Sequence, residues 1–203
     1  MTQAAYVGFS MGGQIAQIAA AYLPGHVTHT ILMGTSLDFE PGFLALEGKP
    51  SKEGLSSPCK DYVTWVTEPL NPTALSPEER LNRYIKTWWH LDGRQTDFDA
   101  AFFEHQGQSI FALTGADDPY PTHARAMKAS YNQHAHAPQQ MKCPTLIIQG
   151  ALDPVFPLDH ADPLHNKIKG SELIVWDDFG YALSPRHFKR MIEAIDLFIQ
   201  TRP

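Results

Sequence analysis

The most constraining feature of this sequence is a Gly-x-Ser-x-Gly motif that joins a strand pattern to a helix pattern. Residues 8–13 read GFSMGG, after the apolar run 4–9 and before the Ala-rich stretch 14–22. The apolar side chains of that stretch recur at helical spacing: Ile15, Ile18 and Ala19. A second strand pattern follows at residues 28–33. Strand, tight turn, helix and strand form a βαβ unit, which predicts a parallel sheet.

Alternating strand and helix patterns return near the end of the chain. Residues 144–149 (PTLIIQ) and 172–176 (ELIVW) read as buried strands, with a short helix between them at 159–168. Ser184-Pro185 then begins a last helix. Its expected apolar face consists of Phe188, Met191, Ile192, Ile195 and Phe198.

The middle of the chain has a different pattern. Residues 41–58 read as a loop, and Ser76-Pro77-Glu78-Glu79 is a capping box that predicts the start of a helix. Further helices are expected at 98–111 and 122–134. The aromatic side chains of this region predict its own core or an apolar roof over a substrate: Tyr84, Trp88, Trp89, Phe102, Phe103 and Phe111. We therefore expect an α/β core made of residues 1–38 and 141–203, with residues 39–140 as an inserted helical cap.

Ser10 is the candidate nucleophile, because a serine on a sharp strand-to-helix turn projects its hydroxyl from the sheet edge. Small residues two places on either side would let the strand and the helix approach closely. The backbone N–H of Met11 would point at the oxyanion, aided by the positive end of the helix. The alternative is a glycine-rich turn whose serine only caps the helix.

The chain resembles the α/β-hydrolase superfamily, and within it the aclacinomycin methylesterase-like branch. The resemblance rests on GFSMGG, on LDFEPGF at the start of the cap, on PTLIIQGALDP and on GYALSPRHF. It implies the carboxyl-terminal part of an α/β-hydrolase fold and a serine hydrolase of carboxylic esters. The family has four strands and their helices before its elbow strand, and a loop in that part donates the second oxyanion-hole N–H. This chain begins at the elbow strand.

The resemblance also assigns the other catalytic positions. Asp153 matches the acid that would fix the tautomer of a histidine, and Asp38 is the alternative acid. The family's histidine position reads Tyr181 here, and a phenol with a pKa near 10 cannot take the serine proton at neutral pH in the same way. His187 is the fallback base, although a surface position on the last helix is the simpler expectation. The resemblance therefore predicts a hydrolase with impaired turnover.

Two other functions remain open. The chain could be a non-catalytic α/β-hydrolase-like binding or interaction protein, as Tyr181 and the shorter fold suggest. It could also be a nucleotide-binding βαβ unit, with residues 8–13 around a phosphate and Asp38 on a ribose hydroxyl, although the glycine spacing differs from Gly-x-Gly-x-x-Gly.

No cofactor and no metal are expected. His134 and His136 would lie on different faces of a helix end, and His160 and His165 are five residues apart, so solvated side chains are the simpler interpretation. The net charge of −6 and the absence of a basic run argue against nucleic acid.

The chain has only two cysteines, which lie far apart in the sequence, and this predicts a location in the reducing cytoplasm. The sequence has no apolar run long enough to predict a membrane span. The expected ligand is a small apolar or aromatic ester. The strand at residues 4–9 would be an open sheet edge, which predicts that a second copy of the chain, a partner or rearranged local segments cover it.

Overall fold

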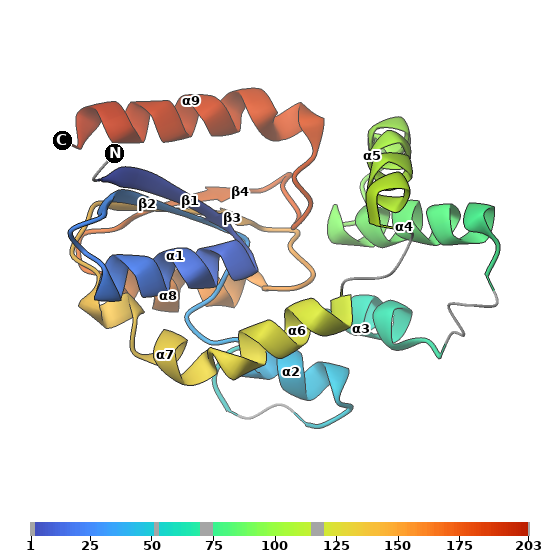
Figure 1. Ribbon diagram of the computed structural model, residues 1–203, viewed down its shortest axis with the longest axis horizontal. Coiled ribbons are helices and arrows are strands. Elements are labelled where there is room, and N and C mark those ends of the chain that lie inside the picture. Colours follow the sequence, from blue (N-terminus) through green and yellow to red (C-terminus); the bar gives the residue numbers. More distant parts are fainter. Residues whose placement is uncertain (1–2, 51–52, 70–74, 115–119, 203) are drawn as a thin grey trace.

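The computed structural model describes residues 3–50, 53–69, 75–114 and 120–202, and a parallel sheet lies at the centre of this part (Figure 1). Four strands form it in the order β1-β2-β3-β4, namely β1 (Ala4–Phe9), β2 (Val27–Met33), β3 (Thr145–Gly150) and β4 (Glu172–Trp176). All three pairings are parallel. The predicted α/β class is therefore confirmed.

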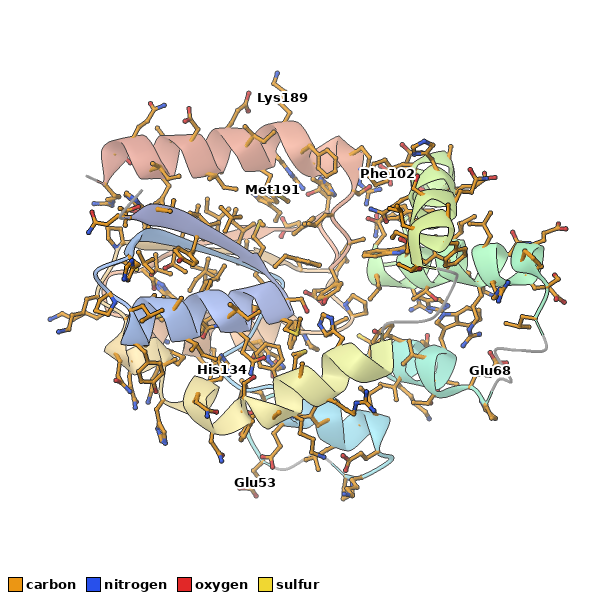
Figure 2. The ribbon with its side chains drawn as sticks, viewed as in Figure 1. Glu53, Glu68, Phe102, His134, Lys189 and Met191 are labelled. Atoms are coloured by element: carbon orange, nitrogen blue, oxygen red, sulfur yellow. The ribbon has the colours of Figure 1, made fainter. Side chains whose placement is uncertain are left out.

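Helices cover both faces of the sheet. α1 (Met11–Tyr22) and α8 (Ala161–Lys167) lie on one face, and α9 (Pro185–Thr201) lies on the other (Figure 1). A parallel sheet buried on both faces needs strands that are apolar throughout, and Ile31, Leu32 and Ile148 are fully buried. Figure 2 shows Met191 pointing from α9 toward the sheet and Lys189 pointing away from it.

The region between β2 and β3 is helical. Its elements are α2 (Glu40–Leu46), α3 (Lys60–Thr67), α4 (Pro77–Leu91), α5 (Ala100–Thr114), α6 (Tyr120–Ala129), α7 (Tyr131–Ala135) and the 3₁₀ turn η2 (Pro138–Gln140). A second 3₁₀ turn, η3 (Leu158–His160), leads into α8. The capping box at the start of α4 is confirmed in both directions, since Glu79 N–H donates to Ser76 Oγ and Ser76 N–H donates to the Glu79 carboxylate.

Two expectations for this region are wrong. The stretch expected to be a loop, 41–58, contains α2, where Pro41 occupies the first turn and supplies a favourable φ. The single helix expected at 122–134 is interrupted at Ser130, whose hydroxyl donates to the Ala126 carbonyl and so offers the backbone an alternative partner.

The expected apolar faces of two helices also need correction. Ile15 is 54% exposed on α1, whereas the neighbouring Gln14 and Gln17 are buried at 1% and 0%. On α9, Ile192 is 65% exposed while Met191 and Phe198 are buried. Helical spacing identified an apolar stripe in both cases, but it could not say which side of the helix meets the rest of this chain.

All four strands come from residues 1–38 and 141–203. Helices α6 and α7 of the region 39–140 also contact α1, so part of that region lies directly against the helix layer that covers the sheet. The boundaries between core and cap stay a proposal. No helix in the described ranges is long and apolar enough to cross a membrane.

Candidate functional site

Ser10 lies on a strained turn between β1 and α1. Its φ of 54° and ψ of −119° are rare for a residue with a side chain, and such strain persists only where the surroundings hold it. Its N–H donates to the Met33 carbonyl at 3.0 Å, and its carbonyl accepts from Thr35 Oγ1 at 3.1 Å. The side chain makes no capping hydrogen bond to α1. The turn is therefore built like a nucleophile elbow, and this geometry disfavours the simple helix cap.

The glycines around Ser10 have unequal roles. A Cβ on Gly8 would lie 2.3 Å from the Gly12 carbonyl oxygen, and a Cβ on Gly13 would lie 2.7 Å from the Thr35 side chain. A Cβ on Gly12 would meet nothing within 4 Å. Close packing thus requires Gly8 and Gly13, whereas the expected packing role of Gly12 is wrong.

The nucleotide-binding alternative gains no support from this turn. Gly8 and Gly13 are explained by the packing of the strand, the helix and the Thr35 loop. Asp38 Oδ1 accepts hydrogen bonds from Tyr131 Oη at 3.0 Å and from Glu40 N–H at 2.8 Å. Asp38 therefore ties the β2 loop to α7, which also weighs against its role as the catalytic acid.

An apolar cluster lies beside the elbow. Met11, the first residue of α1, contributes to it, and so does the ring of Tyr181. The other members are Phe39, Phe43, Met127, Val155 and Phe156. The first N–H groups of a helix have no acceptor within the helix, so Met11 N–H stays the candidate oxyanion donor.

Asp153 lies in the turn that follows β3 and is 3% exposed. Its Oδ1 accepts from Val155 N–H at 2.7 Å and Phe156 N–H at 2.9 Å, and its Oδ2 accepts from Gln149 Nε2 at 3.2 Å. Burial raises the pKa of Asp153 to about 7, even though these three hydrogen bonds each lower it. Oδ2 has room in its lone pairs for one more donor, which is what an acid that orients a base requires.

Tyr181 is held by the end of α4. Its N–H donates to the Leu91 carbonyl at 2.7 Å, and a Cβ on Gly180 would lie 2.6 Å from the Asp92 carbonyl carbon. Its ring lies 4.7 Å from that of Phe9 and 6.2 Å from that of Phe156, between centroids. The structure thus brings position 181 next to Phe9, which precedes Ser10, and next to Phe156, which belongs to the turn that holds Asp153.

His187 is not the surface residue that we expected, since it is only 1% exposed. Arg186 Nε lies 3.0 Å from its Nε2, Arg190 Nη2 lies 2.8 Å from its Nδ1, and the Phe179 ring meets it edge-on at 5.0 Å. Burial, then Arg190 and Arg186, lower the pKa of His187 to about 4. A ring enclosed in this way is poorly suited to be a fallback base.

Two further histidines are buried, where solvated side chains were expected. His134 is 0% exposed and its Nε2 pairs with Gln17 Oε1 at 3.1 Å, beneath α1 (Figure 2). His160 is 2% exposed and lies between Ser36 Oγ and the Ser56 carbonyl. Within the described ranges, no three His, Cys, Asp or Glu side chains gather in a way that could hold a metal ion.

Sequence reasoning missed the residues that support the site. Gln149 holds Asp153, and a glutamine inside an otherwise apolar strand was the available signal. Asp92 and Arg186 form an ion pair of 2.7 Å between the end of α4 and the start of α9, with the Asp92 side chain fully buried. No local signal could have paired these two residues.

Comparison with known proteins identifies the fold family. No model of a known protein family matches the chain. Rhodomycin D methylesterase DnrP of Streptomyces peucetius is 31% identical over 181 residues, which cover 87% of this chain and 60% of that protein. Serine hydrolase BPHL of Homo sapiens is 24% identical, over 96% of this chain and 54% of that protein.

A solved structure gives the same result. The 2-hydroxy-6-oxo-6-phenylhexa-2,4-dienoate hydrolase from Rhodococcus sp. strain RHA1 superposes with a TM-score of 0.66 at 19% identity, over 98% of this chain and 64% of that one. The chain has an α/β-hydrolase fold. It spans about 60% of the length of the methylesterase that it matches, so the activity of a whole enzyme is a matter for proposal.

Proposed function

We propose that this α/β-hydrolase chain carries the nucleophile and acid of a serine hydrolase of carboxylic esters, and that Tyr181 impairs its turnover. The observation that carries the proposal is the backbone of Ser10, held at a φ of 54° with no capping role for its hydroxyl. The similarity to rhodomycin D methylesterases supports a carboxylic ester, and a methyl ester in particular, as the substrate class.

The proposed chemistry uses the turn at Ser10, the apolar cluster beside it and position 181. Ser10 Oγ attacks the ester carbonyl, and Met11 N–H stabilises the oxyanion that forms. The apolar cluster around Met11 and Phe156 favours an apolar or aromatic ester. The serine proton needs an acceptor near neutral pH, and the phenol of Tyr181 does not supply one. Attack by Ser10 is therefore slow in this chain.

Labelling with a fluorophosphonate, which reacts with activated serines, tests the proposal. The unmodified chain should label slowly, and Tyr181→His should label faster by about 100-fold or more, the usual gain from a general base. Tyr181→Phe is the matched control, because it keeps the ring, adds no base and should leave the rate unchanged. Ser10→Ala should abolish labelling, whereas Ser109→Ala, on the exposed side of α5, should not.

Fast labelling of the unmodified chain that depends on Ser10 and is unchanged in Tyr181→His would contradict the proposed base position. His187→Ala would then show whether the enclosed histidine is the base.

A non-catalytic binding protein is the second candidate, and the packing of Tyr181 favours it. The Tyr181 ring contacts Phe9, and a Cβ on Gly34 would lie 3.3 Å from Tyr181 Cδ2, so the phenol fits closely at the base position. Under this alternative Tyr181→His gains no labelling. The Ser10→Ala variant should then bind an aromatic methyl ester, measured by calorimetry, as tightly as the unmodified chain does.

A further inference from the structure

Strand β3 carries an amide side chain where the sheet otherwise buries apolar groups. Gln149 is 1% exposed, it follows the buried residues Ile147 and Ile148, and it lies beside Val175 of β4 in the sheet register. A buried amide costs free energy unless its polar atoms are hydrogen-bonded. The partners of Gln149 therefore indicate what this residue does in the protein.

The Gln149 amide nitrogen joins the Asp153 carboxylate to the backbone of the same turn. Nε2 donates to Asp153 Oδ2 at 3.2 Å and to the Phe156 carbonyl at 2.8 Å, and it lies 3.4 Å from the Gly150 carbonyl. An amide NH₂ group has two hydrogens, and the two shorter contacts use both of them. Gln149 thus holds the carboxylate and the end of the turn with one nitrogen atom.

The two oxygens of the Asp153 carboxylate have unequal partners. Oδ1 accepts from Val155 N–H at 2.7 Å and from Phe156 N–H at 2.9 Å, which occupies both of its lone pairs. In the part of the chain that the structure describes, Oδ2 accepts a hydrogen bond from Gln149 alone. One lone pair of Oδ2 is left for the N–H of a base, so Gln149 contacts the oxygen that the proposed chemistry would use.

The Asp153 turn is also locked to the loop that carries position 181. A Cβ on Gly150 would lie 2.2 Å from the Phe179 carbonyl oxygen, and Leu152 N–H donates to the same carbonyl at 2.9 Å. Tyr181 lies two residues after Phe179. A side chain that sets the direction of Asp153 within its turn therefore also sets its direction relative to position 181.

Hydrogen bonds alone stabilise the charge of Asp153 among the described residues. No cation acts on it there, and burial raises its pKa to about 7. The ionisable groups on the neighbouring elements are Cys59 at the start of α3, Tyr181 in its loop and His160 in η3. Burial, then Asp153, raises the pKa of the Cys59 thiol, which is therefore neutral near pH 7. Gln149 is the side chain that favours the carboxylate over the protonated acid.

We propose that Gln149 is a positioning residue, which directs Asp153 Oδ2 toward a base at position 181 and keeps that carboxylate ionised. The inference rests on the proposed function, because the acid has a catalytic role only where a base serves Ser10. An asparagine would be one methylene too short to reach both acceptors, and a glutamate would add a second negative charge. The length and the neutral NH₂ group of glutamine therefore fit this position.

Labelling of Ser10 by the fluorophosphonate in the Tyr181→His variant, followed between about pH 5 and 10, tests the catalytic part. Gln149→Met keeps the shape of the side chain and removes both donors. Labelling at neutral pH should fall by about 10-fold and recover at higher pH, where Asp153 ionises without the amide. A purely structural defect would lower the rate equally at every pH. Gln17→Met is the matched control, because Gln17 is 0% exposed and donates to the Ser36 carbonyl instead.

Carbon-13 NMR of the aspartate carboxyl groups tests the contact without any labelling. The Asp153 signal, assigned by its loss in Asp153→Asn, should titrate about one pH unit or more higher in Gln149→Met than in the unmodified chain. In the unmodified chain the side-chain amide protons of Gln149 should shift with the same midpoint as Asp153. This last measurement needs no variant, so it remains decisive if Gln149→Met fails to fold by circular dichroism.

The outcomes separate this inference from the proposed function. If Tyr181→His gains labelling and Gln149→Met leaves its pH profile unchanged, the role of Gln149 is overturned while the proposed function stands. Amide protons of Gln149 that ignore the titration of Asp153 overturn it as well. If Tyr181→His gains no labelling, the proposed function fails, and the catalytic role of Gln149 falls with it.

Discussion

The turn at Ser10, which is the proposed nucleophile turn, and the loop at Gly180 and Tyr181, which is the proposed base loop, are built with the same close packing but carry different side chains. A Cβ on Gly8 would lie 2.3 Å from the Gly12 carbonyl oxygen, and a Cβ on Gly180 would lie 2.6 Å from the Asp92 carbonyl carbon. Both turns also use a backbone N–H to fix the critical residue, from Ser10 to Met33 and from Tyr181 to Leu91. Only the first turn keeps the side chain that a serine hydrolase needs.

The difference shows that packing and catalysis place separate demands on a loop. Packing at the base loop depends on Gly180 and on the contact with the end of α4, and neither depends on the side chain at position 181. Exchange of the imidazole for a phenol therefore leaves the loop in place. The same exchange removes the proton acceptor near neutral pH. Substitutions in these two turns can therefore test packing and catalysis separately.

The largest expected effect concerns Asp153 when a histidine stands at position 181. In the Tyr181→His variant, Asp153→Asn should cancel most of the roughly 100-fold gain in labelling, because the imidazole loses the carboxylate that fixes its tautomer. Asp38→Asn is the matched control and should keep the gain, since Asp38 binds Tyr131 and Glu40 instead. Equal losses in both variants would show that neither carboxylate orients the histidine specifically.

A second prediction compares the glycines of the nucleophile turn. Gly8→Ala should lower the free energy of unfolding by about 2 kcal/mol, because its Cβ has only backbone atoms to displace. Gly12→Ala has open space and lies in a helix, so it should change stability by less than about 1 kcal/mol or increase it. Urea unfolding measures both. Equal destabilisation by the two variants would refute the unequal packing roles.

The smallest effect concerns pH and the base loop. Burial raises the pKa of Asp92 to about 6, although Arg186 lowers it. The folded protein therefore holds a proton that the unfolded chain has released, and the contribution of Asp92 to stability falls as pH rises from about 4 to 6.

Asp92→Asn should remove that component and flatten the dependence of stability on pH by about 1 kcal/mol per pH unit between about pH 4 and 6. The measurement is urea unfolding at several pH values, with Asp97→Asn as the exposed control. An identical slope in the unmodified chain and the Asp92 variant would contradict the raised pKa.

Local patterns in the sequence predicted the strands of the sheet and their parallel arrangement, whereas the order of the strands came from the structure. The expected strand 172–176 is confirmed residue for residue as β4, and 4–9 is confirmed as β1. Short apolar runs bounded by glycine or proline predict strands well, because burial on both faces requires such runs. The missed helix α2 begins among residues rich in glycine and proline, where local propensity favours a loop.

For the candidate site, the sequence indicated which residues to consider but not which residues surround them. Met11 and Tyr181 belong to one apolar cluster, and Ser10 directly precedes Met11 at the start of α1. The burial of His187 was not predictable, because Arg186, Arg190 and Phe179 enclose it from two segments of the chain. The roles of Ser10 and Asp153 in catalysis stay predictions, and so does a cytoplasmic location.

The sequence by itself determined the α/β class, the glycine-framed turn at Ser10 and the phenol at position 181, because each depends on neighbouring residues or on one identity. Tertiary structure decided which side of α1 faces outward, since Gln14 and Gln17 find partners more than a hundred residues away or in the β2 loop. It also decided the pKa values of Asp92, Asp153 and His187, because burial depends on all the segments packed around a group. Such contacts have no local signature, so periodicity can locate an apolar stripe but cannot say what covers it.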